Sequence, residues 1–314
     1  MSRPARILVA LGGAALAALL AFAFWLYRHP LAAFATLGRR TLKKEGFVER
    51  AIEAPSGRLT YFAGGAGPTV VLLHGAGDQA GTFSQIAPAL ASRRRILIPD
   101  LPGHGESAPK TGPIRLTAVA EGVEALLAKE ALSGPVVLAG NSMGAWVACL
   151  VARRNPGRVS QLLLVNGGPL RGEDRGLTLT PKSREEARKT VEALRDPASP
   201  HVPDFLLDDI VREAARGPLG RLDVRDMEAN LLDGKIREIF VPADVIWGVS
   251  DRLLPLDYAK KLVAELPSAR LTGLPACGHV PPVECPTDLL AAMNRALDAP
   301  LPAPGTSAPP GERP

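Results

Sequence analysis

Residues Gly140–Gly144, with the sequence G-N-S-M-G, directly follow the apolar run 135–139. The run is typical of a buried strand, so the pentapeptide places a serine between two glycines where a strand is expected to turn into a helix. A serine on such a sharp turn has a strained backbone, and glycine lets neighbouring backbone come close because it has no β-carbon. The spacing predicts an exposed nucleophilic serine, although the same residues also fit an ordinary strand–turn–helix junction.

Two sets of backbone N–H groups are expected to face Ser142. The N–H of Met143 opens the next helix, and its position above the serine suits a site where negative charge develops. Residues 69–73 (TVVLL) are typical of a buried strand, and they lead into His74–Asp78 (H-G-A-G-D), a loop with two glycines. Such a loop can present a second N–H to the same oxygen.

Two later strand-like runs also end in polar loops. Residues 245–247 precede Asp251, and residues 270–274 precede His279. Ligand and catalytic groups of open α/β sheets gather beyond the carboxyl ends of the strands. We therefore expect Ser142, Asp251 and His279 to meet at one edge of the sheet.

Five motifs in this order resemble those of α/β-hydrolase fold lipases and esterases. They are L-L-H-G-x-G (Leu72–Gly77), D-L-P-G-H-G-E-S (Asp100–Ser107), G-N-S-M-G, W-G-x-S-D (Trp247–Asp251) and G-H-x-P-P-x-E-x-P (Gly278–Pro286). The likeness covers roughly residues 47–298 apart from a divergent middle. It is greatest to membrane-anchored monoacylglycerol lipase or phospholipase A-type members that carry one N-terminal hydrophobic helix. The resemblance implies an α/β fold with a mainly parallel sheet flanked by helices and a helical cap insertion.

The resemblance also implies roles for individual residues. Ser142 is the nucleophile, His279 is the general base, and Asp251 orients the histidine. The N–H groups of Ala76 and Met143 form the oxyanion hole. The substrate contacts expected from the glycine loop and from the apolar face of the cap are Gly75, Gly77, Leu206 and Leu207.

Other polar and aromatic residues have simpler interpretations. His74 and His104 are expected to be structural, because neither follows the strand that should deliver the base. Asp174 is the main rival to Asp251 as the triad acid, but its surroundings do not match the family motif. Trp146 is expected to pack in the core rather than to contact substrate.

The three cysteines are too few for a disulfide scaffold. Cys149 is expected to be buried in the helix after Ser142. Cys277 and Cys285 could form a disulfide only if the loop of His279 folds back. The spacing of these two cysteines and His279 fits no zinc site, and the sequence predicts neither a metal nor an organic cofactor.

Composition limits the remaining functions. The chain has 314 residues, of which 46% are hydrophobic, enough for one large α/β domain with a buried sheet and an insertion. The net charge of +5 is modest, and basic residues between 39 and 44 suit anionic lipid headgroups better than a DNA groove. We therefore expect no nucleic-acid partner.

An apolar stretch at residues 7–27 follows Arg3 and Arg6 and is long enough to cross a bilayer as a helix. A cleaved signal peptide is the alternative, but the run is longer than a usual signal core. We expect residues 1–28 to be a transmembrane anchor and residues 29–46 to be a basic juxtamembrane linker.

Two features of the sequence give opposite indications of the side of the membrane on which the hydrolase domain lies. The excess of positive charge after the helix favours a cytoplasmic domain. The short basic N-terminus instead resembles an exported signal anchor, as in bacterial relatives whose hydrolase domain faces the periplasm. We expect an inner-membrane protein with a periplasmic hydrolase domain. Gly12 and Gly13 would let two such helices approach closely, as in a homodimer.

The rest of the chain divides by its pattern. Alternating strand and helix signals at 47–167 and 238–298 predict the α/β core. The charged, helical segment 168–237 is expected to be a cap or lid over the site, with a remote helical elaboration as the alternative. The proline-rich tail 299–314 is expected to be disordered.

These features together predict a membrane-bound serine esterase acting on lipid esters, either a monoacylglycerol or a lysophospholipid or phospholipid. The bilayer would be its partner. A hydrolase of carbon–carbon bonds, of the meta-cleavage type, would use the same triad. A catalytically silent α/β-hydrolase scaffold that binds a lipid or a protein is the alternative from another class.

Overall fold

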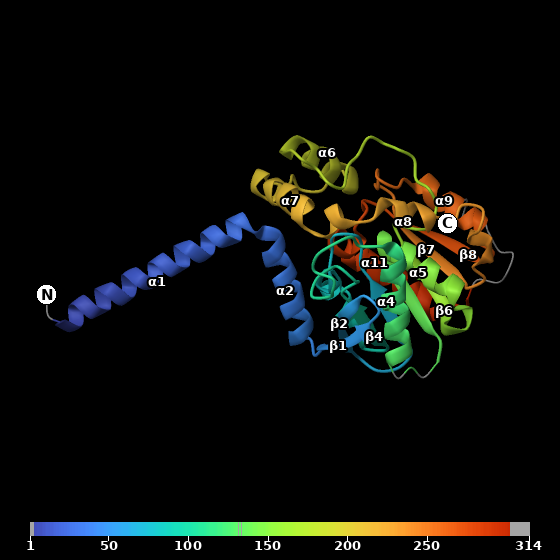
Figure 1. Cartoon of the computed structure of the whole chain (residues 1–314), viewed down its shortest axis with the longest axis horizontal. Coiled ribbons are helices and arrows are strands. Elements are labelled where there is room, and N and C mark those ends of the chain that lie inside the picture. The colour runs from blue at the N-terminus through green and yellow to red at the C-terminus, as the bar shows by residue number, and fades with distance from the viewer. Residues whose placement is uncertain (1–2, 131, 133, 302–314) are drawn as a thin grey trace.

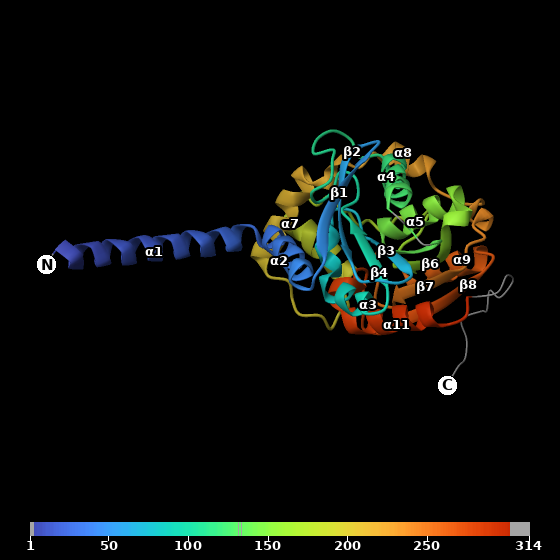
Figure 2. The same ribbon diagram turned by 90° about the horizontal axis from the view of Figure 1, so that it is seen from below.

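A computed structural model describes residues 3–130, 132 and 134–301 of the chain. An eight-stranded sheet lies at its centre, in the order β1-β2-β4-β3-β5-β6-β7-β8 (Figures 1 and 2). β2 is antiparallel to both of its neighbours and the other pairs are parallel, so the predicted mainly parallel sheet is confirmed. The strands are β1 (Val48–Ala54), β2 (Gly57–Gly64), β3 (Thr69–Leu73), β4 (Arg95–Pro99), β5 (Val136–Asn141), β6 (Val159–Val165), β7 (Ala243–Gly248) and β8 (Ala269–Leu274).

Separate apolar clusters cover the two faces of the sheet. Val71 and Leu73 of β3 belong to one cluster, and Val70 and Leu72 belong to the other, because successive side chains of a strand point to opposite faces. Burial on both faces explains the continuous apolar sequence of this strand. The first face is covered by α4 (Leu116–Lys129), α5 (Met143–Arg154) and α9 (Leu256–Glu265), and the second by α3 (Ala87–Ala91) and α11 (Pro286–Asp298) (Figure 2).

Shorter helical turns connect these elements, and a helical insertion separates β6 from β7. The insertion lies along one side of the sheet in Figure 1 and ends near α9. Its elements are α6 (Arg184–Leu194), α7 (Asp204–Arg216), η3 (Pro218–Arg221), α8 (Val224–Ala229) and η4 (Ile236–Glu238). The connecting turns are η1 (Ala80–Gln85), η2 (Pro156–Arg158) and α10 (Pro281–Glu284).

The segment expected to be a basic linker, 29–46, is instead largely a helix, α2 (Pro30–Lys44), which packs against η1. A β-carbon at Gly38 would lie 2.5 Å from the carbonyl oxygen of Gly81, so the two backbones are in direct contact. Leu42 is fully buried on the same face, while Lys43 is exposed. The segment therefore joins α1 to the core as a packed helix, and its basic residues did not indicate this apolar face in the sequence.

The first helix, α1 (Arg3–Arg28), projects away from the rest of the molecule (Figure 1). Its segment Leu11–Arg28 is apolar and long enough to cross a membrane, and none of it is buried, although an N-terminal signal sequence has the same properties. At its end, the ring of Tyr27 lies 5.2 Å from that of Phe205 on α7. At the other terminus, residues 302–314 of the predicted disordered tail lie outside the described residues.

Candidate active site

Ser142 occupies the turn between β5 and α5, with φ of 53° and ψ of −120°. A positive φ is unusual for serine and indicates backbone strain. The flanking glycines make the turn possible. A β-carbon at Gly140 would lie 2.2 Å from the carbonyl carbon of Gly144, and one at Gly144 would lie 2.1 Å from the carbonyl oxygen of Leu73. The G-x-S-x-G spacing thus reflects close backbone packing on both sides of the serine.

The three side chains expected to meet at the sheet edge form a continuous hydrogen-bonded chain. Nε2 of His279 lies 2.9 Å from Oγ of Ser142, and Nδ1 of the same ring lies 2.7 Å from Oδ2 of Asp251. Asp251 and His279 are almost fully buried, with 2% and 4% of their surfaces exposed. The imidazole therefore connects the hydroxyl to a carboxylate that is shielded from water.

The carboxylate of Asp251 is held by four donors. Besides His279, Oδ2 accepts a hydrogen bond from Nδ2 of Asn166 at 2.8 Å, and Oδ1 accepts from the N–H groups of Leu253 and Leu254 at 2.9 and 3.0 Å. Hydrogen bonds from four donors fix the direction of the carboxylate. The acid is therefore oriented before any substrate binds.

Two asparagines escaped the sequence analysis. Asn166 follows β6 and also accepts a hydrogen bond from the N–H of Gly248, so it joins two strand ends. Asn141, the second residue of the pentapeptide, donates through Nδ2 to the carbonyl oxygens of Val165 and His279 at 3.1 and 3.0 Å. The sequence could have indicated Asn166, because it is a polar residue directly after a buried strand. The three triad residues likewise lie in loops that follow strands.

The glycine loop passes directly over the serine. A β-carbon at Gly75 would lie 3.3 Å from Cβ of Ser142, and Ala76 lines the same cavity as Ser142 and Met143. Met143 is the first residue of α5, where a helix leaves its N–H without a carbonyl partner in the helix. The structure thus brings both expected oxyanion residues to the serine. Gly77 lies farther along the loop, against Leu219.

A cavity of about 420 Å³ opens above Ser142. Its wall is mainly apolar and comes from both the core and the insertion, with Trp146 and Tyr258 on the core side and Leu222, Met227 and Leu231 on the insertion side. The insertion therefore covers the serine, as a cap would. Trp146, expected only in the core, packs there and also lines this cavity.

Leu206 and Leu207, expected to contact substrate, lie on α7 outside the lining of this cavity. Leu207 instead lines a separate hollow between α6 and α7. The reason is the position of α7, which packs against α6, η3 and the ends of α1 and α2 rather than over Ser142. The part of the cap above the serine is α8 together with Leu222 before it and Leu231 after it.

The strained turn at Ser142, the hydrogen-bonded chain and the eight-stranded sheet agree with a match to a known family. The family model described as "Alpha/beta hydrolase family" matches residues 70–293, which is most of the chain. The chain belongs to the alpha/beta hydrolase family. The fold and the relationship expected from the five motifs are thereby confirmed.

The relatives of this alpha/beta hydrolase include hydrolases and esterases of different substrates. It is 30% identical over 241 residues to a 2-hydroxy-6-oxononadienedioate/2-hydroxy-6-oxononatrienedioate hydrolase of Cupriavidus pinatubonensis, with 69% of this chain and 82% of the relative covered. It is 30% identical over 263 residues to a pimeloyl-[acyl-carrier protein] methyl ester esterase of Chromobacterium violaceum, with 74% and 96% covered. Its fold is similar to that of a bacterial membrane phospholipase A, with a TM-score of 0.73, 24% identity, and 93% of this chain and 99% of that chain covered.

His74 and His104 of this alpha/beta hydrolase have structural contacts, as expected. Nε2 of His74 accepts a hydrogen bond from the N–H of Leu101 at 2.9 Å, and Nδ1 of His104 lies 3.1 Å from the carbonyl oxygen of Pro102. Burial lowers the pKa of His74 to about 4 and that of His104 to about 3. Both rings are therefore neutral near pH 7, as suits their packing. Asp174, the rival acid, is exposed and accepts a hydrogen bond from Gly176 N–H.

A disulfide joins Cys277 to Cys285, so the loop of His279 does fold back. The two cysteines are eight residues apart, and His279 lies between them. Cys149 is a buried free thiol whose pKa is raised by burial. The disulfide closes a short loop around the histidine of the hydrogen-bonded chain.

Reduction of this disulfide is expected to lower the free energy of unfolding by about 2.5 kcal/mol, because the closed loop limits the freedom of the unfolded chain. Thermal unfolding of the detergent-solubilised protein, with and without a phosphine reductant, measures the effect. The double variant Cys277→Ser/Cys285→Ser should melt at the temperature of the reduced wild type and should not respond to reductant. A melting temperature unchanged by reduction would contradict the prediction.

Proposed function

We propose that this hydrolase is a membrane-anchored serine esterase that cleaves carboxylic esters of lipids. The observation that carries the proposal is the hydrogen-bonded chain from Asp251 through His279 to Ser142, whose serine lines an apolar cavity. In the proposed roles, Ser142 is the nucleophile, His279 is the base, and Asp251 is its orienting acid. The N–H groups of Ala76 and Met143 form the oxyanion hole.

The reaction follows from the positions of these groups. Nε2 of His279 takes the proton of Ser142 as Oγ attacks the ester carbonyl carbon. The carbonyl oxygen becomes an anion that the two N–H groups stabilise, each contributing on the order of 3 kcal/mol. His279 then gives its proton to the departing alcohol oxygen, which leaves an acyl group on Ser142. Water, activated by the same imidazole, hydrolyses this acyl-enzyme and restores the serine.

The shape and polarity of the cavity support a lipid substrate. Its apolar wall suits an acyl chain, because burying the chain's apolar surface is favourable. An acyl chain carries no polar group that would need a hydrogen-bond partner inside the cavity. Arg171 and Glu228 also line the cavity, and both are exposed. They would face a glycerol or a phosphorylated headgroup outside the apolar part. Monoacylglycerols, lysophospholipids and phospholipids are therefore the proposed substrates.

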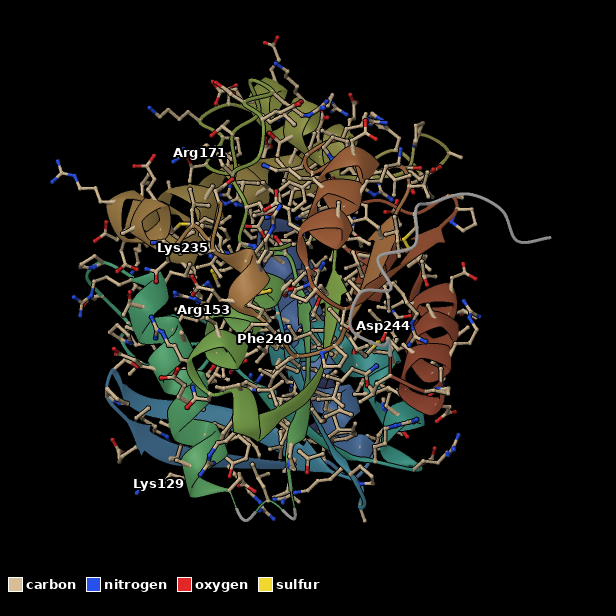
Figure 3. All side chains as sticks on the ribbon, turned by 90° about the vertical axis from the view of Figure 1, so that its right-hand side faces the viewer. Lys129, Arg153, Arg171, Lys235, Phe240 and Asp244 are labelled. Carbon is tan, nitrogen blue, oxygen red and sulfur yellow. A yellow bond between two sulfur atoms is a disulfide. The ribbon has the colours of Figure 1, made fainter. Side chains whose placement is uncertain are left out.

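Two features support attachment to a membrane on its oxidising side. The apolar helix α1 has 26 residues, about 39 Å at 1.5 Å per residue, which exceeds the roughly 30 Å of bilayer hydrocarbon. The disulfide favours a periplasmic domain, since such bonds are rare in the cytosol. Lys129, Arg153, Lys235 and Arg171 are all labelled in the view of the side turned away from α1 (Figure 3).

Replacement of Met227 by tryptophan should shorten the cavity and change the preferred acyl length. We expect the kcat/KM for long-chain monoacylglycerol and lysophospholipid to fall about tenfold or more, with short-chain esters little affected. Hydrolysis of an acyl-length series by the purified variant measures this. Phe240→Trp is the matched control, because Phe240 is 73% exposed on the side turned away from α1 (Figure 3). A wild-type protein that hydrolyses soluble short-chain esters but neither monoacylglycerols nor phospholipids would refute the proposal of a lipid substrate.

A carbon–carbon bond hydrolase is the second candidate. It is favoured by the 30% identity to the Cupriavidus pinatubonensis hydrolase, and it would use the same serine and histidine. The dicarboxylate-type substrates of such a hydrolase suit the apolar cavity less well than acyl chains do, because burying a charged carboxylate without a partner is unfavourable. Turnover of a vinylogous diketone, with no hydrolysis of acylglycerols, would decide for this candidate. Failure of a fluorophosphonate to label the wild type would instead indicate a silent binding scaffold.

A further inference from the structure

The C-terminal end of α6 and the residues that follow it touch both loops of the proposed triad. We call residues 193–199, which lie on the way from α6 to α7, the connector. The N–H of His279 donates to the carbonyl oxygen of Leu194 at 2.7 Å, and the N–H of Arg252 donates to that of Ala193 at 2.9 Å. A β-carbon at Gly278 would lie 2.2 Å from the same Leu194 oxygen. The cap backbone is thus bonded to the base itself and to the residue after the acid.

One carboxylate joins the connector to the loop of His279. Oε2 of Glu284 accepts a hydrogen bond from the N–H of Gly278 at 2.6 Å. Oε1 accepts from the N–H of Asp196 at 2.8 Å and from Oγ of Ser199 at 2.6 Å. Short bonds to an ionised acceptor are stronger than neutral ones. Glu284 therefore ties the residue before the histidine to two residues of the cap.

A second tie runs from the connector to the loop of Asp251. Oγ of Ser250, the neighbour of the acid, donates to the carboxylate of Asp196, and this bond holds the pKa of Asp196 below its ordinary value. The N–H of Ser250 also donates to the carbonyl oxygen of Cys277 at 2.9 Å. The connector, the acid loop and the base loop thus form one network.

We propose that Glu284 is a positioning residue, which sets the ring of His279 relative to Ser142 by bonding the histidine loop to the connector. This inference rests on the proposed serine-hydrolase function. The hydrogen bonds of Glu284 described above go to Gly278, Asp196 and Ser199 and not to the ring or the serine, so it acts through the backbone of Gly278 and His279. The disulfide fixes the two ends of the loop, while Glu284 fixes its tilt toward the cap. A displacement of about 1 Å between reacting groups can cost about 100-fold in rate.

Glu284→Gln in the full-length, detergent-solubilised protein tests the proposal. Glutamine keeps the size of the side chain, but it has one acceptor oxygen, and its amide N–H groups would face the N–H donors. We expect kcat for an acyl ester, and the rate of fluorophosphonate labelling, to fall about 10- to 100-fold, with KM changed by less than about threefold. A purely structural role would lower the melting temperature without this selective loss of kcat.

Two variants separate the connector from general damage to the cap. Ser250→Ala removes the tie to the acid loop independently of Glu284, and we expect a several-fold fall in kcat with KM maintained. It also supplies the test if Glu284→Gln does not fold. Asp204→Asn breaks the ion pairs of Asp204 with Arg184 and Arg188 inside the cap and should keep the wild-type kcat.

The outcomes are distinct. Wild-type kcat and labelling rate in folded Glu284→Gln, or in Ser250→Ala where Glu284→Gln does not fold, would overturn the positioning role. An equal loss in Asp204→Asn would also overturn it, because the effect would then belong to the cap in general. A wild-type protein that is neither labelled at Ser142 nor active on esters would refute the proposed function itself.

Discussion

Ser142→Ala is expected to abolish covalent labelling by a fluorophosphonate and to lower the kcat for ester hydrolysis by about 10⁴-fold or more. The reason is chemical, because Oγ of Ser142 is the atom that His279 can activate, at 2.9 Å from Nε2. Residual turnover would come from the oxyanion donors and from substrate binding alone. In-gel fluorescence after labelling and steady-state hydrolysis of a monoacylglycerol measure the two effects.

Ser92→Ala provides the control for this variant. Ser92 is exposed, and its hydroxyl donates only locally, to the carbonyl oxygen of Ala89 at 2.6 Å. It should label and turn over like the wild type. Persistent labelling of Ser142→Ala at another residue would refute the assignment of the nucleophile.

Asp251→Asn should lower kcat by about 10⁴-fold while leaving the fold intact. The asparagine amide cannot stabilise the imidazolium, and it can hold the ring in the wrong tautomer. It would also lose a charge that Asn166, Leu253 and Leu254 now hold through hydrogen bonds. Single-turnover labelling rates and steady-state kcat should fall together, because both depend on the basicity of His279.

Asp174→Asn is the matched control, since it makes the same chemical change at the rival acid. Asp174 is exposed and its carboxylate is bonded to its own loop, at Gly176. We expect its kcat to remain within about twofold of the wild type, as is usual for surface positions. Loss of activity in Asp174→Asn, with activity kept in Asp251→Asn, would reverse the assignment of the acid.

The sequence predicted those features that depend on local backbone sterics or on strand order. The strained turn at Ser142 depends on Gly140 and Gly144, which lie within five residues of each other. At each glycine a β-carbon would lie about 2 Å from a neighbouring backbone atom. The meeting of Ser142, Asp251 and His279 follows from parallel strands that end at one edge. Both kinds of inference need only neighbouring residues and the order of elements.

The features that the sequence did not predict depend on which surfaces face each other. The apolar face containing Leu206 and Leu207 indicated that α7 is packed, but it could not show that the partner would be α6 rather than the cavity. The exposed basic residues of α2 similarly gave no indication that Gly38 and Leu42 form a packed face of a helix. The role of Asn166 depends on a bond across 85 positions to Asp251, which no local pattern contains.

The contact between Gly38 and Gly81 has a consequence for how the enzyme would sit on a membrane. A flexible tether would let the catalytic body tumble freely above the lipid. Here α2 is fastened to the body, and α1 meets α7 through Tyr27 and Phe205. In a protein anchored through α1, as proposed, the height and tilt of the cavity mouth above the headgroups would be set at His29, where α1 ends and α2 begins (Figure 1).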